Sequence, residues 1–142
     1  MKYLITAAVA ATLIGGAAQA ADPAAGEATF EKACRTCHMV VTDGGDTLVK
    51  GGKTGPNLYG IVGRVAASGE DFKRYGKSLE ALGATGFTWT EAEIAAYLAD
   101  PRDYLRAKLD DSKARSNMAY KLPSDDDRAN VAAYLASVSP GS

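Results

Sequence analysis

The feature that most constrains this chain of 142 residues is the run Cys34-Arg35-Thr36-Cys37-His38, which holds its only two cysteines and its only histidine. Two thiols three positions apart, followed at once by an imidazole, can form thioether bonds to the two vinyl groups of one haem while the imidazole ligates the iron. The motif predicts covalent haem attachment at Cys34 and Cys37, with His38 as the proximal axial ligand.

The first twenty residues have the pattern of a secretory signal peptide. Lys2 provides a basic start, residues 3–14 are almost wholly apolar, and Ala18-Gln19-Ala20 is a small-x-small cleavage site. A membrane anchor is the alternative, but the apolar stretch is shorter than the roughly 20 residues that a bilayer-spanning helix needs. We expect cleavage after Ala20, a single mature domain over residues 21–142 without a membrane span, and a periplasmic location.

Three other uses of Cys34 and Cys37 have to be weighed. A thioredoxin-like redox pair would need a βαβ setting and gives His38 no role. A zinc site would need four nitrogen or sulfur ligands, whereas the cysteines and the histidine make three. A simple disulfide is the third alternative. The complete motif behind an export signal favours haem attachment over all of them.

The second axial ligand can be sought by elimination among the three methionines, because no second histidine exists. Met1 leaves with the signal peptide, and Met39 is tied to the proximal side by its neighbour His38. A lone methionine is often core filler. Met118, however, lies in the polar stretch 116–120 between predicted helices, which favours a ligand loop and predicts Met118 as the sixth ligand.

Composition and pattern predict a helical domain. The net charge of −1 supplies no basic excess for a nucleic-acid partner, and 46% apolar residues argue against disorder. Glycines crowd residues 42–69, which predicts turns wrapped around an object rather than regular elements. Helical signals occur at Asp22-Pro23, Ser78–Leu82, Thr90–Glu93, Asp100-Pro101 and Ser124–Asp127, the last followed by the apolar stripe Val131, Tyr134, Leu135 and Val138.

These residues resemble the class I c-type cytochromes, and most closely the bacterial cytochrome c2 and c-550 group. The resemblance covers nearly all of the mature chain. It runs through Gly26, Phe30, the haem motif, residues 55–64, Trp89, Tyr97, Pro101, residues 118–122 and residues 128–135. It implies the all-α cytochrome c fold, in which four to five helices and long glycine-rich loops surround one covalently attached haem c.

The resemblance also implies roles around the haem. The Pro56 carbonyl would accept the N–H of His38, and Tyr97 would lie near the Met118 sulfur and donate to it. Arg64, Tyr75 and Trp89 would surround the propionates, with ordinary core packing as the alternative. Gly26 would let the first helix cross the last one closely, against Tyr134.

The implied function is one-electron transfer rather than enzyme catalysis, because a His/Met haem has no open site. The resemblance implies the cytochrome bc1 complex as electron donor and a photosynthetic reaction centre or cytochrome c oxidase as acceptor. It also implies that the carrier is a monomer. Exposed cations would steer docking to acidic surfaces. The candidates are Lys32, Arg35, Lys50, Lys53, Lys113, Arg115 and Lys121.

Two other functions remain open. The chain is longer than short mitochondrial members around residues 42–49 and 106–115, and the second expansion, just before Met118, would make the ligand loop more mobile. A labile sixth ligand would allow a gas-binding or enzymatic haem protein. A haem-free thiol module is the other alternative, and it would purify colourless with reactive cysteines.

Overall fold

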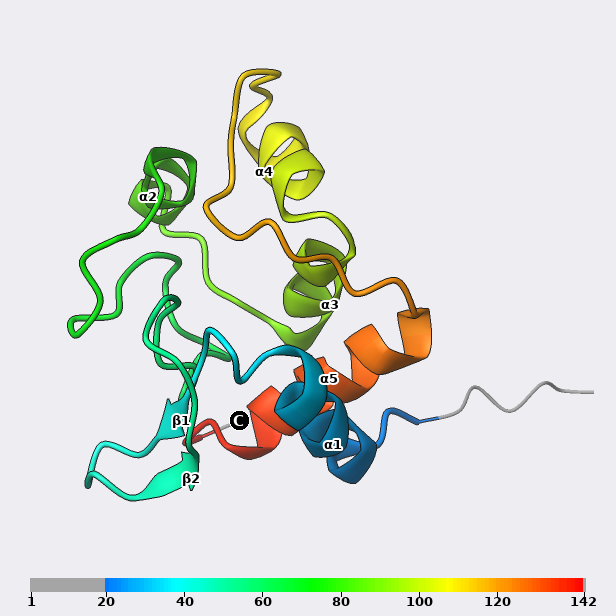
Figure 1. The fold of residues 1–142 in the computed structure, drawn as a ribbon. Helices are drawn as coiled ribbons and strands as arrows, with labels where there is room; N and C mark the ends of the chain where they lie inside the picture. Colours follow the sequence, from blue (N-terminus) through cyan, green and yellow to red (C-terminus); the bar gives the residue numbers. More distant parts are fainter. Residues whose placement is uncertain (1–19, 142) are drawn as a thin grey trace, which may run out of the picture.

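The computed structural model describes residues 20–141, so the predicted signal peptide lies outside the described residues apart from Ala20. Helices dominate this part of the chain, which confirms the predicted all-α class (Figure 1). The helices are α1 (Pro23–Ala33), α2 (Lys77–Ala84), α3 (Glu91–Ala99), α4 (Pro101–Leu109) and α5 (Asp125–Ser137); the strands are β1 (Val40–Val41) and β2 (Thr47–Val49). None of the helices within residues 20–141 has the length and apolar character needed to cross a bilayer.

Four of the five predicted helix starts are confirmed by side-chain caps, and α2 begins after Gly76 without one. Each capping oxygen accepts a backbone N–H of the first turn: Asp22 from Ala24, Thr90 from Glu93 and Ser124 from Asp127. Asp100 caps α4 by accepting from the N–H groups of Arg102 and Asp103. The predicted turn at Asp100-Pro101 is therefore the start of a full helix.

Two elements differ from the sequence prediction. Over residues 42–69 the sequence predicts turns without regular elements. This is wrong for Thr47–Val49, because β2 pairs antiparallel with β1. Val40 and Val49 face each other in this hairpin and both are buried, so the core stabilises it. Helix α2 also continues through Gly83 to Ala84, beyond the predicted span Ser78–Leu82. A side chain at position 83 would collide with the Ala66 carbonyl, so only glycine lets α2 pack so closely.

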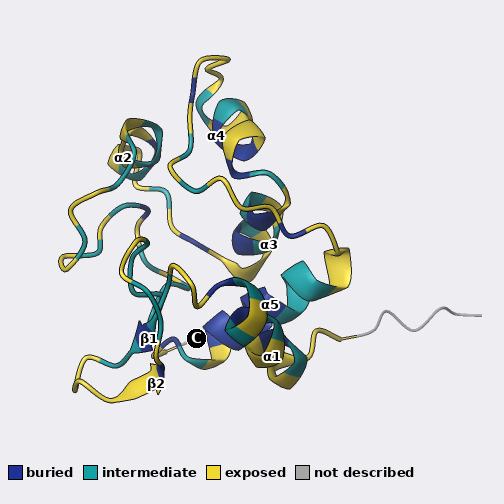
Figure 2. Ribbon diagram, in the orientation of Figure 1, coloured by how far each residue is buried: buried dark blue, intermediate teal, exposed yellow. Residues whose placement is uncertain are grey.

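The core is centred on α5, which packs against both α1 and α3. The predicted stripe on one face of α5 is too narrow, since Val131–Ala136 are all buried while Val138 is only partly so. Two helices covering α5 from different sides explain the wider burial (Figure 2). Phe30 of α1 is fully buried and meets the ring of Tyr134 at 5.6 Å between centroids.

Gly26 is where α1 and α5 cross, as the family resemblance implies. A Cβ at this position would stand 1.9 Å from the Asn130 carbonyl oxygen and 2.9 Å from the Tyr134 Cβ. No L side chain fits there without moving one helix away from the other.

We expect the substitution Gly26→Ala to lower the free energy of unfolding by about 3 kcal/mol, because overpacking forces backbone shifts. Denaturant titration would measure it. Gly44→Ala is the matched control, since its Cβ would meet Thr42 Oγ1 at an ordinary 3.7 Å. Equal losses in the two variants would contradict a helix crossing that specifically requires Gly26.

Candidate functional site

The five-residue motif forms the turn that follows α1. The Cys34 N–H donates to the Phe30 carbonyl at 2.9 Å, and the N–H groups of Cys37 and His38 donate to the Cys34 carbonyl at 3.1 and 2.9 Å. Side chains three and four positions apart on such turns lie on one side. Both cysteines are free, Cys34 buried and Cys37 exposed. The two thiols and the imidazole are therefore presented together.

The imidazole of His38 is oriented by one hydrogen bond. Its Nδ1–H donates to the Pro56 carbonyl oxygen at 2.9 Å. Because a carbonyl can only accept, Nδ1 carries the proton and Nε2 keeps a free lone pair. Burial lowers the pKa of His38 while the bond to Pro56 opposes that effect. The neutral ring, with Nε2 available, is the form that ligates a metal.

The glycine-rich loop packs directly against the motif. The N–H of Gly52 donates to the Arg35 carbonyl and that of Gly55 to the Cys37 carbonyl, both at 2.8 Å. A Cβ on Gly55 would stand only 2.3 Å from Cε1 of His38, so the backbone itself covers the imidazole. The object around which the glycines wrap therefore includes the histidine.

The buried thiol of Cys34 is not tuned for disulfide exchange. Burial, with a smaller contribution from Cys37, raises the pKa of Cys34 to about 11. Catalytic thiols have lowered pKa values, since the thiolate is the nucleophile. The described residues also contain no βαβ unit. Both observations argue against the thioredoxin-like alternative.

Met118 lies on the segment between α4 and α5, half-buried and packed against the hydrophobic core. Its N–H donates to the Ser116 hydroxyl at 3.1 Å, and that hydroxyl shares a 3.1 Å hydrogen bond with the Tyr97 hydroxyl. Tyr97 is thus joined to the Met118 segment through Ser116. Within residues 20–141, no hydrogen bond links Tyr97 to the Met118 sulfur, so the predicted bond stays a prediction.

The residues predicted around the propionates lie close to one another. The backbone N–H of Trp89 donates to the backbone carbonyl of Arg64 at 3.0 Å. The centroid of the Trp89 ring lies 5.1 Å from that of the Tyr97 ring. Arg64 Nη2 donates to the Asn57 carbonyl at 2.9 Å, and burial lowers the pKa of Arg64. The Tyr75 hydroxyl accepts the Gly69 N–H at 3.2 Å. Tyr75 and Arg64 both approach Gly69.

The seven predicted docking cations are all exposed. Two of them are ion-paired: Arg35 with Glu31 at 2.7 Å, and Lys121 with Asp100. Arg74 was missed from the sequence, although its Nη2 donates to the Lys53 carbonyl at 2.5 Å and so brings a further cation beside Lys53. No local pattern in the sequence links these two positions.

Arg128 is a second residue that the sequence analysis did not assign to the site. Its Nη1 donates to the carbonyls of Leu122 and Pro123, each at 2.7 Å, and only 16% of its side chain is exposed. The guanidinium therefore fixes the chain just after the Met118 segment. Its position within the first turn of α5, next to that segment, is the signal that could have identified it.

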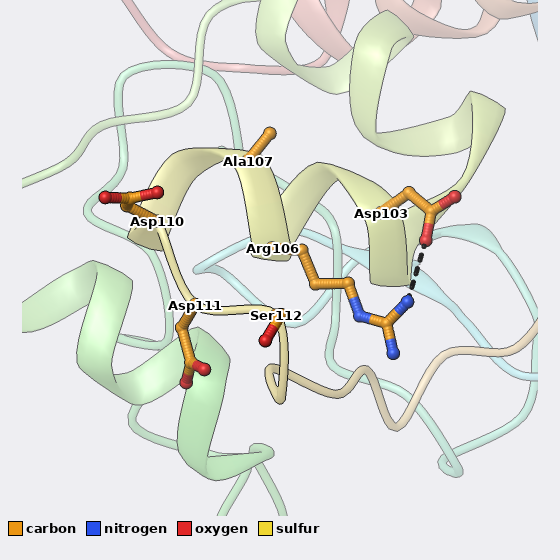
Figure 3. A pocket seen from close by; sticks show the side chains of 6 residues that line it. All are labelled: Asp103, Arg106, Ala107, Asp110, Asp111 and Ser112. Carbon is orange, nitrogen blue, oxygen red and sulfur yellow. Dashed lines mark hydrogen bonds and ion pairs between the residues drawn. The ribbon is translucent and has the colours of Figure 1, made fainter.

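A shallow hollow on α4 and the turn after it is unrelated to this site. Its lining residues are Asp103, Arg106, Ala107, Asp110, Asp111 and Ser112 (Figure 3). Arg106 is paired with Asp103 at 3.4 Å, and none of the predicted site residues lines the hollow.

Comparison with known proteins identifies the family. Residues 21–135 match the family described as cytochrome c oxidase, cbb3-type, subunit III. Cytochrome c2 of Rhodobacter capsulatus is 52% identical over 139 residues, which cover 97% of this chain and 98% of that protein. The chain belongs to the class I c-type cytochromes. Cytochrome c-550 of Paracoccus denitrificans is 43% identical over 144 residues, covering 99% of this chain and 90% of that protein.

The structural comparison agrees with this assignment. The solved structure of cytochrome c2 from Rhodobacter capsulatus gives a TM-score of 0.77 at 54% identity, covering 82% of this chain and 97% of that chain. The predicted cytochrome c fold is thereby confirmed. The protein is an electron carrier with one covalently bound haem c and not an enzyme.

The residues of this cytochrome fit a haem c. The two free thiols lie on the one turn that follows α1. The neutral imidazole of His38 keeps an unprotonated nitrogen on the side away from Pro56, and the backbone at Gly55 covers the imidazole ring. A thioether side chain is available at Met118 on a separate segment. This donor set is the one that haem c uses for attachment and axial ligation.

Proposed function

We propose that this cytochrome is a soluble periplasmic carrier that moves one electron at a time through a haem c whose iron is ligated by His38 and Met118. The observation that carries the proposal is the 2.9 Å hydrogen bond from His38 Nδ1 to the Pro56 carbonyl. It fixes the tautomer, leaves Nε2 free to ligate the iron, and would raise the basicity of that ligand.

Each residue of the site has a physical task in this proposal. A bound haem c supplies reversible one-electron exchange at its iron. Cys34 and Cys37 would hold it by thioether bonds, and His38 and Met118 would ligate its iron. With no open position, oxygen and peroxide are disfavoured as reactants, and the methionine sulfur favours ferrous iron.

Polar residues near the haem would tune its electrostatics. We assign Arg64, Tyr75 and Trp89 to the propionates, supported by the backbone hydrogen bond between Trp89 and Arg64 and by the approach of the Arg64 and Tyr75 side chains to Gly69. The Arg64 guanidinium, oriented by the Asn57 carbonyl, would balance propionate charge. Tyr97 would orient the Met118 segment through Ser116.

The compartment and domain boundaries belong to the same proposal. Residues 1–20 would act as a cleaved signal peptide, leaving residues 21–142 as the mature domain. The family match that begins at residue 21 supports this boundary. Disulfides form readily in the oxidising periplasm. Haem attachment would use both Cys34 and Cys37, so the mature protein would carry no free cysteine there.

The partners we propose are the cytochrome bc1 complex as electron donor and a photosynthetic reaction centre or cytochrome c oxidase as acceptor, with the carrier acting as a monomer. The similarity to proteins named cytochrome c2 and c-550 supports this role. The exposed cations, among them Lys53 with Arg74 beside it, would steer fast and transient docking to acidic surfaces.

We expect the charge reversal Lys53→Glu to slow electron transfer to cytochrome c oxidase about three- to tenfold at low ionic strength, through slower association. Stopped-flow rates over a salt series would measure it, and the loss should shrink as salt rises. Arg102→Glu makes the same charge change on α4, outside the cation set, and should leave the rate near that of the wild type. A loss independent of salt, or equal in both variants, would contradict docking at Lys53.

A further inference from the structure

The end of the Met118 segment is firmly held. The Leu122 N–H donates to the Leu98 carbonyl of α3 at 2.8 Å. The carbonyls of Leu122 and Pro123 accept from the half-buried guanidinium of Arg128 at 2.7 Å each. Opening of the segment at this end therefore has to break the hydrogen bond between Leu122 and Leu98, so exchange of the Leu122 amide reports on that opening.

Between Met118 and Leu122, one side chain makes a polar contact with the rest of the molecule. Among residues 118–121 of the described chain, only Lys121 makes a side-chain polar contact, the ion pair with Asp100. Asp100 is itself immobilised, because its other oxygen accepts the N–H groups of Arg102 and Asp103 at 3.1 and 3.0 Å. The pair thus joins the Met118 segment to the start of α4.

The same ammonium is also available to a partner. The Lys121 side chain is 52% exposed and that of Asp100 is 23% exposed, so the pair lies at the surface. Exposed pairs of this kind shift an equilibrium by only about two- to fivefold. Several carboxylates on an acidic partner can therefore compete with the single carboxylate of Asp100, because the Lys121 ammonium cannot pair fully with Asp100 and the partner at once.

We propose that the Lys121–Asp100 ion pair is a latch on the Met118 segment, and that an acidic protein surface opens it by binding Lys121 during docking. This inference rests on the proposed function, in which Met118 ligates the iron and Lys121 docks. Lys121 is a positioning residue here, since it acts on the ligand loop and does not touch the haem iron. Docking is then coupled to the stability of the iron–sulfur bond.

The latch can be tested on the haem-loaded protein by amide hydrogen exchange, followed by NMR at Leu122. Asp100→Asn keeps an N-cap but removes the charge, and Lys121→Gln removes the other partner. We expect each to speed exchange of the Leu122 amide about two- to fivefold, and the double variant to do no more than either alone. Lys121→Arg should restore the wild-type rate.

Controls separate this effect from general destabilisation. Lys113→Gln removes an exposed cation that has no ion pair among the described residues, and it should leave Leu122 exchange unchanged. The Leu58 amide, which donates to the Met39 carbonyl, should exchange at one rate in all variants. Additive effects in the double variant, or equal acceleration at both amides, would overturn the latch.

Polyglutamate serves as the acidic probe for the docking step. Added at low salt, it should raise Leu122 exchange in the wild type toward the Asp100→Asn rate and leave Lys121→Gln unaffected. If polyglutamate binds, as seen from shifted Lys53 resonances, but Leu122 exchange is unchanged, the claim that docking opens the latch would be overturned. The ferric near-infrared sulfur-to-iron band is recorded in parallel; its absence from the wild type would reject Met118 ligation, a separate failure of the proposed function.

Discussion

Replacing Cys37 with alanine should abolish the normal holoprotein, reducing the yield of haem-stained protein by an order of magnitude or more. Cys37 is exposed, so its thiol adds little to packing, and the loss has to come from the missing thioether bond. The yield would be measured by haem staining of a denaturing gel and by visible absorbance of the exported fraction.

The size of this effect follows from what the haem does for the fold. We expect that a chain with a long glycine-rich segment and few large apolar side chains would bury too little surface to offset its conformational entropy, so that the cofactor would act as part of the core. Thr36→Ala is the matched control, because it alters the exposed neighbour without removing a thiol, and it should mature at the wild-type level. A red, stable Cys37→Ala product at full yield would contradict the attachment.

The second large effect is expected for Met118→Ala. The haem should stay attached through Cys34 and Cys37, while the sixth position opens and the iron gains high-spin character. Loss of the thioether removes its preference for ferrous iron, so the reduction potential should fall by on the order of 100 mV or more. Redox titration and the near-infrared spectrum would measure the change.

Met39→Ala is the control for Met118→Ala, since it makes the same chemical change at another half-buried methionine. It should keep the near-infrared band and shift the potential far less. An unchanged potential in Met118→Ala, or an equal fall in both variants, would mean that another group ligates the iron.

Much of this fold could be predicted because its signals are local. The caps at Asp22, Thr90 and Ser124 act on N–H groups two or three residues away, so short sequence windows contain both partners. The cysteine motif is equally local. The close crossing at Gly26 came from the family resemblance, and the structure explains it by the Asn130 carbonyl.

What could not be predicted depends on residues distant in sequence. The hairpin of β1 and β2 is held by burial of Val40 and Val49 rather than by strand-forming pattern. The wide burial of α5 results from its two neighbours, α1 and α3. Pairs such as Lys121 with Asp100 have no signature in the sequence, because only the tertiary fold brings them together.

The central claim, a covalent haem ligated by His38 and Met118, is tested most directly by optical spectra of the exported protein from the visible to the near infrared, with a haem-stained denaturing gel. The account predicts a staining band, low-spin spectra in both oxidation states and the ferric sulfur-to-iron band. Covalent haem with high-spin features and no such band would contradict Met118 ligation and favour an open-site haem protein. A colourless protein with reactive thiols would contradict haem attachment itself.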